Sequence, residues 1–308
     1  MRWMVALCAL RSSNVAMFLS IANGDAMDKN LILQQCDIIE QAVGVIRAQC
    51  VAPPRPPRPS PAIDRDAVIA AVVDSGVPDI DWRDRGEAPM GYCKGMGIAY
   101  ALVFREWLQG NAFALKMAKA QTGDDSADAL SWYNSNFVNL RMPNNEDGRN
   151  TLRHLFVLMY GLGMRESSGK FCEGRDQSAD NVTDDTAEAG LFQTSYDARY
   201  GCADITTLLQ LYKSMPDDPQ KVGPIFHEDV SCSSTDLQNY GSGDGAKFQY
   251  YQKMSPMLAV EACGVGMRMI GGDDGHWGPL RRKEAELKTE VDDLFAEVER
   301  IVENGEQA

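Results

Sequence analysis

The chain has 308 residues, of which 44% are hydrophobic and 24% charged, the balance of a soluble globular protein rather than a fibrous or disordered one. Its formal net charge of −14, from 44 acidic and 30 basic residues, opposes general binding to nucleic acid or to anionic membrane surfaces. One main domain with appendages is expected, with a neutral or cationic partner.

The first 51 residues form a separate N-terminal segment. Its two apolar runs, 3–10 and 15–22, are divided by polar residues, so neither is long enough to span a bilayer. Arg11 followed by the second run resembles a secretory signal peptide, and a short docking helix is the alternative. Apolar residues then recur every three or four positions between Asn30 and Cys50, which predicts an amphipathic helix. We expect no integral membrane span and a secreted or periplasmic location, with a cytoplasmic one as the alternative.

A proline-rich tract, residues 52–62 (APPRPPRPSPA), follows this segment. Proline at most positions forbids a helix and favours an extended, semi-rigid connector. A linker is the expected role, and a ligand for a proline-reading module is the alternative. Residues 63–308 are expected to form the main domain.

Helical patterns dominate the main domain. The expected helices span 95–120, 128–140, 150–166, 204–215, 247–270 and 280–302. The last carries an apolar stripe typical of a helix packed on a core, made of Leu287, Val291, Leu294, Val298 and Ile301. Between Cys172 and Gly190 the composition favours turns or a small irregular sheet. The predicted fold class is mainly α (α+β), with a minor β-element.

Eight cysteines are scattered along the chain without a CxxC pair, and only three histidines accompany them. This pattern disfavours a zinc site, and we expect no metal and no other cofactor. The even number is compatible with disulfides in an exported protein and with small buried core residues.

Glu166 stands at the end of the expected helix 150–166. The buried face of that helix is predicted to comprise Leu152, Leu155, Phe156, Met159 and Leu162. Glu166 continues this stripe one turn on, so its carboxyl should point where the leucines point. Removal from water raises a carboxyl pKa and leaves a proton for donation at neutral pH, which suits a general acid. The alternative is a helix that ends near Gly163, with Glu166 solvated or capping.

A run of acidic residues follows Glu166. Cleavage of an acetal between sugars needs a proton on the leaving oxygen, and inverting enzymes position water with a second carboxylate. The candidates for that second group are Glu173, Asp176, Asp180, Asp184, Asp185 and Glu188. Most are expected to be solvated loop charges, and Asp185 or Asp176 is favoured for the second role.

The RESSG sequence at the end of an apolar helix, a polar insert and then GLFQTS resemble the lysozyme-like superfamily, which includes goose-type lysozymes and soluble lytic transglycosylases with their SLT domain. The resemblance covers roughly residues 145–270 and implies a lysozyme-like helical domain. It implies that Glu166 is the catalytic acid and Ser167 its companion. The implied sugar-cleft motif is Gly190, Leu191, Phe192 and Gln193, with phenylalanine in place of the usual methionine.

Two further features bear on this resemblance. The NYGSG sequence is similar to a Tyr-Asn-x-Gly motif that these families place opposite the acid, with the first two residues reversed, which implies Asn239 and Tyr240 as cleft residues. In goose-type lysozymes an aspartate closely follows the cleft motif, whereas here Asp197 comes later. Lytic transglycosylases need no such group, because the substrate's own hydroxyl attacks. Hydrolysis and transglycosylation therefore both remain open.

The expected function is cleavage of β-1,4 glycosidic bonds in peptidoglycan, with a polysaccharide as partner. A chitosanase or chitinase is the alternative among enzymes. A non-catalytic glycan-binding or morphogenetic protein is the alternative from another class.

Two other stretches received a structural interpretation. Lys94, Gly95 and Gly97 lack the spacing of a phosphate-binding loop, so a helix start or close packing is expected there. His276 and Trp277 have side chains that can contact a sugar, but a turn before the last helix is favoured.

Overall fold

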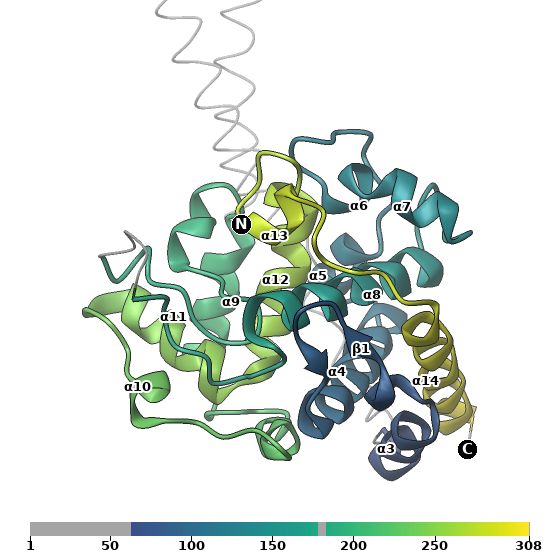
Figure 1. Cartoon of the computed structure of the whole chain (residues 1–308), viewed down its shortest axis with the longest axis horizontal. Helices are drawn as coiled ribbons and strands as arrows, with labels where there is room; N and C mark the ends of the chain where they lie inside the picture. Colours follow the sequence, from purple (N-terminus) through teal and green to yellow (C-terminus); the bar gives the residue numbers. More distant parts are fainter. Residues whose placement is uncertain (1–62, 178–182, 308) are drawn as a thin grey trace, which may run out of the picture. The chain divides into compact units, whose positions relative to one another are not determined.

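The computed structural model describes residues 63–177 and 183–307, and this part of the chain is mainly helical with one small two-stranded sheet (Figure 1). The expected N-terminal helix and the proline-rich linker lie outside the described residues. None of the helices described is both long enough and apolar enough to cross a bilayer.

The first half of the domain leads to the long helix that carries Glu166. Its elements are α3 (Arg65–Asp74), the 3-10 helix η1 (Val77–Asp79), β1 (Asp81–Trp82), β2 (Gly86–Glu87), α4 (Met90–Leu108), α5 (Ala112–Met117), α6 (Ala129–Trp132), α7 (Asn134–Asn139) and α8 (Arg149–Ser167).

The second half packs against the first through several elements, among them the buried helix α12, the C-terminal helix α14 and η3. Its elements are η2 (Tyr196–Tyr200), α9 (Asp204–Lys213), η3 (Gly223–His227), α10 (Ser234–Leu237), α11 (Gly243–Met254), α12 (Pro256–Ile270), α13 (Gly278–Arg281) and α14 (Thr289–Gln307).

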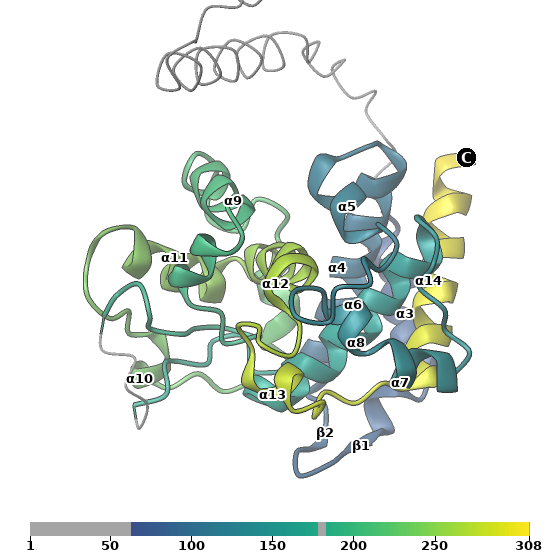
Figure 2. The ribbon, with the colours of Figure 1, turned by 90° about the horizontal axis from the view of Figure 1, so that it is seen from above.

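Three helices, α4, α8 and α12, form the centre of the core. Every residue of α12 from Pro256 to Arg268 is buried, as expected of a helix that is apolar on nearly all sides. This helix contacts α9 and α11 on one side and α5 and α8 on the other, whereas α4 contacts α3, α8 and α14. Figure 2 shows the resulting order, from α11 and α9 through α12 to α8, α4 and α14.

The glycines of α4 allow close packing. A Cβ atom on Gly95 would lie within 2.4 to 2.5 Å of the Phe226 ring, so only glycine lets η3 approach the helix this closely. The Lys94 ammonium pairs with Glu228 at 2.8 Å. The expectation of close packing at these positions, rather than a phosphate loop, is confirmed.

Several expected helices are divided in the structure. Gly110 has a φ of +79°, and Asn111 caps α5 by accepting from two backbone N–H groups, so the expected helix 95–120 becomes two. Pro256 starts α12 and separates it from α11, because proline lacks the N–H that a continuous helix requires. Tyr133 separates α6 from α7, and residues 282–288 separate α13 from α14.

The minor β-element lies before α4. Its two strands pair antiparallel at Asp81–Trp82 and Gly86–Glu87, whereas the described residues between Cys172 and Gly190 form turns, one of the two structures that their composition favours. In that segment Thr183 accepts from the N–H of Thr186 through its hydroxyl and from the N–H of Ala187 through its carbonyl. Such local bonds replace the ladder that a strand would need.

Candidate active site

Helix α8 holds Glu166 as its sequence predicts. Leu152, Leu155, Phe156, Met159 and Leu162 are all fully buried. The helix ends at Ser167, because Ser168 adopts a left-handed backbone with a φ of 54° and the next residue is a glycine that also has positive φ. Glu166 therefore lies in the last helical turn, and its side chain is partly buried.

The surroundings of Glu166 favour its protonated form. Burial, and after it the charge of Glu188, raises the pKa of Glu166 to about 8. Three cations oppose this shift, Arg282, Arg85 and Arg281. The carboxyl therefore retains its proton at neutral pH while its partial exposure keeps it accessible to a ligand.

Glu188 is the carboxyl whose charge acts on Glu166. It is itself partly buried, and burial, followed by the charges of Asp176 and Asp197, raises the pKa of Glu188 to about 7. Sequence reasoning included Glu188 among six candidates but favoured others. Its position two residues before Gly190, where the chain re-enters the core, is the signal that distinguishes it.

Asp185, the favoured second carboxylate, is engaged elsewhere. Its carboxylate lies 2.5 Å from the Arg199 guanidinium, and its backbone carbonyl accepts from the N–H of Asp197 at 2.9 Å. The Arg199 guanidinium in turn lies 4.2 Å from each of the Tyr196 and Tyr200 ring centres. These contacts hold Asp185 against η2, and Glu188 is the carboxyl whose charge acts on Glu166.

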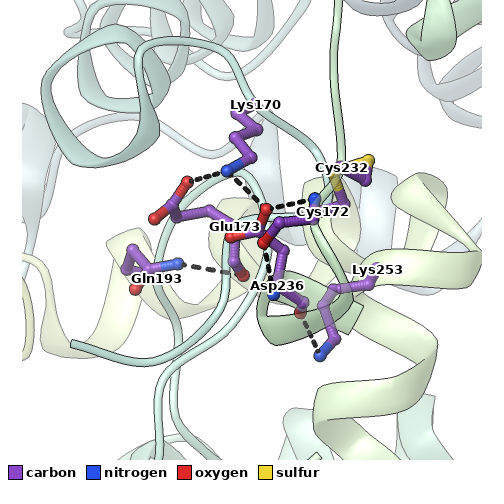
Figure 3. Close-up of a disulfide and its surroundings, with 8 residues drawn as sticks. Lys170, Cys172, Glu173, Gln193, Cys232, Asp236 and Lys253 are labelled. Atoms are coloured by element: carbon purple, nitrogen blue, oxygen red, sulfur yellow. Dashed lines mark hydrogen bonds and ion pairs between the residues drawn. A yellow bond between two sulfur atoms is a disulfide. The ribbon is translucent and has the colours of Figure 1, made fainter. Parts of the chain in front are cut away.

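The turn at Gly190 joins the polar insert to the core. Gly190 has a φ of +75°, and a Cβ atom there would lie 2.9 Å from the Gln252 carbonyl oxygen. Both the backbone conformation and the close contact therefore favour glycine at this position. Its N–H donates to the Glu173 carbonyl at 2.9 Å. The Gln193 side-chain amide donates to the Gly190 carbonyl at 3.1 Å and lies 3.4 Å from the Glu173 carbonyl oxygen (Figure 3). Gln193 thus stabilises the turn.

The expectation that Leu191 and Phe192 contact substrate is corrected. Both side chains are fully buried in the hydrophobic core and leave no surface for a ligand. Their backbone carbonyls anchor the segment, since Ser167 Oγ donates to the Leu191 carbonyl at 2.8 Å and Trp277 Nε1 to the Phe192 carbonyl at 2.9 Å. Ser167, also buried, is therefore a positioning residue that joins the end of α8 to the motif.

Asn239 and Tyr240 lie on an exposed stretch beside the insert. Gln249 holds this stretch by accepting from the Tyr240 N–H at 2.7 Å and donating to its carbonyl at 3.1 Å. The same amide donates to the Asp184 carbonyl at 3.0 Å, and the Arg175 guanidinium lies 4.5 Å from the Tyr240 ring centre. Both side chains are accessible to a ligand at this edge of the insert.

Sequence reasoning missed a polar cluster formed by Ser195, Asp197 and His276. Ser195 Oγ donates to Asp197 at 2.5 Å, and His276 Nε2 lies 3.4 Å from the Ser195 hydroxyl oxygen and backbone nitrogen. Burial lowers the pKa of His276, so the imidazole is neutral at neutral pH. Trp277 is 1% exposed and turns inward, as the favoured structural interpretation implies.

A disulfide fixes the start of the insert. Cys172 and Cys232 are bonded, and Lys170 bridges the same two segments with ion pairs to Glu173 at 3.0 Å and Asp236 at 2.8 Å (Figure 3). The even number of cysteines was compatible with disulfides and with buried core residues, and both kinds occur among the described residues. Three other cysteines, Cys93, Cys202 and Cys263, are free and buried.

Within residues 63–177 and 183–307, no group of three or more histidine, cysteine, aspartate or glutamate side chains is placed to hold a metal ion. Comparisons of the chain with protein-family models, with curated proteins and with solved structures found no match. The function proposed for this chain rests on its own residues.

Proposed function

We propose that the protein cleaves β-1,4 glycosidic bonds in peptidoglycan, with Glu166 as the general acid. The observation that carries this proposal is a partly buried carboxyl at the end of α8 whose pKa is raised to about 8 beside a second carboxyl, Glu188. A carboxyl whose pKa is raised by burial into the neutral range is suited to act as a general acid in such enzymes.

The roles follow from the bond to be broken. The Glu166 carboxyl donates its proton to the glycosidic oxygen, the bond from that oxygen to the anomeric carbon breaks with both electrons on the oxygen, and an oxocarbenium-like centre forms. In hydrolysis, water adds to that carbon and Glu188 accepts the proton of the water. In transglycosylation, a hydroxyl of the same sugar adds instead, gives its proton to the Glu166 carboxylate and leaves an anhydro ring.

The charges near Glu166 support peptidoglycan as the substrate. Arg85, Arg281 and Arg282 are close enough to act on its pKa, so the site has cations within electrostatic range. Peptidoglycan carries carboxylates on its peptide stems, which such cations attract. A neutral chitin chain gains nothing from these charges.

The decisive experiment is Glu166→Gln with purified peptidoglycan and mass spectrometry of the products. Cleavage should fall by at least about 100-fold, because no proton donor remains. The control is Glu290→Gln, the same change at an exposed residue of α14, which should cleave normally. Undiminished cleavage by the Glu166→Gln protein would refute the proposal. The products also distinguish hydrolysis from transglycosylation.

The non-catalytic alternative gives a different result in the same experiment. A glycan-binding protein would release no products in its wild-type form, and its Glu166→Gln variant would bind glycan equally well. A purely binding role gives no reason for a carboxyl whose charged form is disfavoured by burial.

A further inference from the structure

A pocket of about 320 Å³ lies between the end of α12, the η2 segment and the turn before α13. Its lining includes Asp197, Met269, Ile270, Asp274 and His276. The volume is at the lower end of the range for small-molecule sites, and the lining combines apolar surface with a few polar groups, as such sites do.

This pocket, which we name the α12 pocket, adjoins the candidate active site. Asp197 forms part of its wall and also lies near enough to Glu188 to raise the pKa of that carboxyl. Ser195 and His276 connect the same wall to the segment that follows the Gly190 turn. Asp197 thus belongs to the wall of the α12 pocket and lies within electrostatic range of Glu188.

The polar groups of the α12 pocket are mainly anionic. Asp197 and Asp274 contribute carboxylates, and His276 is neutral because burial lowers its pKa. Arg281 is a cation whose charge also lowers the pKa of His276. Its guanidinium donates to the carbonyls of Gly275 at 2.5 Å and His276 at 3.1 Å. The pocket thus offers hydrogen-bond acceptors and negative charge to a ligand that is a donor and a cation.

The apolar part of the lining suits the ring of a sugar. Ile270 and Ala198 are partly or fully buried, whereas Met269 is 53% exposed at the rim. Exposed thioether surface beside carboxylates matches a sugar that has one apolar face and a charged substituent.

We propose that the α12 pocket binds a glucosamine unit through its free ammonium group, so that the enzyme prefers glycans from which N-acetyl groups have been removed. This inference rests on the proposed function, and it defines the substrate class of that site. An N-acetyl group is neutral and gains nothing from the two carboxylates. Glucosamine occurs in de-N-acetylated peptidoglycan and in chitosan, and the pocket chemistry is the same for both.

The test is binding to the Glu166→Gln protein by calorimetry at pH 6 in low salt, with a glucosamine tetramer and an N-acetylglucosamine tetramer. The glucosamine tetramer should bind at least about tenfold more tightly, and added salt should weaken it. Adding Asp274→Asn should remove most of this preference. The matched control is Asp273→Asn, a neighbouring exposed aspartate outside the pocket lining, which should retain it. Equal affinities for the two tetramers, or a preference unchanged by Asp274→Asn, would overturn the inference.

The source of the glucosamine unit and the proposed function are tested separately. Wild-type protein is given peptidoglycan before and after chemical de-N-acetylation, and chitosan. If both deacetylated polymers are cleaved faster than untreated peptidoglycan, the result supports the inference. Equal cleavage of the two peptidoglycans contradicts it. If no polymer is cleaved but the tetramer preference holds, the proposed function fails and the pocket assignment stands.

Discussion

At the scale of single residues, the ionisation of Glu166 depends on the charge of Glu188. Burial raises the pKa of both carboxyls, and the charge of Glu188 adds to the cost of ionising Glu166. Glu188 therefore loses its proton first, with a pKa of about 7, and Glu166 follows with a pKa of about 8. The singly protonated pair, which an acid and base mechanism needs, is most populated between these values.

This coupling predicts the pH dependence of hydrolysis. We expect kcat/KM to rise as pH increases through about 7, where Glu188 ionises, and to fall above about 8, where Glu166 loses its proton. The measurement is initial rate against pH from 5 to 10 on soluble glycan fragments. A rate that keeps increasing to pH 10 would contradict the role of Glu166 as the acid.

Glu188→Gln separates the contributions of the pair. Removing the negative charge that raises the pKa of Glu166 should move the falling limb of the profile to lower pH. If water is the nucleophile, the rate should also fall by about 100-fold or more. Asp185→Asn serves as the comparison, because that carboxylate is paired with Arg199, and it should leave the falling limb in place. An unmoved limb in Glu188→Gln would show that the two carboxyls do not interact.

The raised pKa of Glu166 also predicts the direction in which Glu166→Gln changes the stability of the protein. The folded pKa of Glu166 is raised from 4.5 to about 8, so its stabilising contribution is complete below about pH 4.5 and is lost as pH rises to about 8. The glutamine variant lacks this loss and should melt at an equal or higher temperature than wild type at pH 8. Calorimetric scans at pH 5 and pH 8 measure the difference, and a lower melting temperature at pH 8 would contradict the burial of a charge-prone group.

At the scale of elements, a second buried acid lies where α4, α9 and α12 meet. Glu261 on α12 is 6% exposed, and burial followed by the charge of Glu106 raises the pKa of Glu261 to about 8, while a hydrogen bond with Tyr212 opposes the shift. The folded state therefore holds this proton more tightly than the unfolded chain does. Stability from Glu261 is lost as pH rises from about 4.5 to 8.

Glu261→Gln should accordingly gain stability relative to wild type as pH rises. The difference in the free energy of unfolding should grow by at least about 1 kcal/mol between pH 5 and pH 8, the equivalent of one pKa unit. Urea denaturation at both pH values measures it. The matched control is Glu299→Gln on α14, which breaks a buried pair with Arg153 at 3.0 Å and should lose about 3 kcal/mol. A difference for Glu261→Gln that is the same at both pH values would contradict the raised pKa.

The sequence predicted helices well where one apolar stripe ran without interruption. The stripe from Leu152 to Leu162 is buried as expected, and it directs Glu166 correctly. Helix breaks were missed where the cause is a local conformation, such as the positive φ of Gly110. The positions of the two strands were not predicted, because two residues on each side of a turn give no periodic pattern.

The candidate site was predictable only in part, for a related reason. Glu166 follows from the periodicity of its own helix. The role of His276 depends on a contact far away in the chain, because Ser195 and His276 are 81 positions apart. No spacing rule within a single element reports such a pair. The burial of Leu191 and Phe192 was also hidden, because an apolar motif at a cleft and one in a core have the same composition.

At the scale of the whole molecule, one covalent link spans the second half of the domain. The Cys172–Cys232 disulfide joins residues 60 positions apart, and Glu173, next to it, accepts from the Gly190 N–H that shapes the candidate site. The three free cysteines among the described residues are buried, and burial raises the pKa of Cys93 to about 11, so these thiols exchange slowly with the disulfide. Free thiols are already reduced, so among the described residues a reductant acts on the Cys172–Cys232 bond.

Loss of this link should destabilise the protein and impair the site together. Closing a loop of this length stabilises the folded state by about 4 kcal/mol relative to the open unfolded chain, so the Cys172→Ala, Cys232→Ala double variant should lose a free energy of unfolding of that size. Glycan cleavage should fall as well at temperatures where the variant stays folded, because the Glu173 carbonyl is no longer fixed. Urea denaturation with and without reductant measures the first effect. The double variant itself should not respond to reductant. In the wild type, thiol titration shows whether the reductant has opened the disulfide. If the disulfide is open and the free energy of unfolding is unchanged, the disulfide is not what holds the insert against the core.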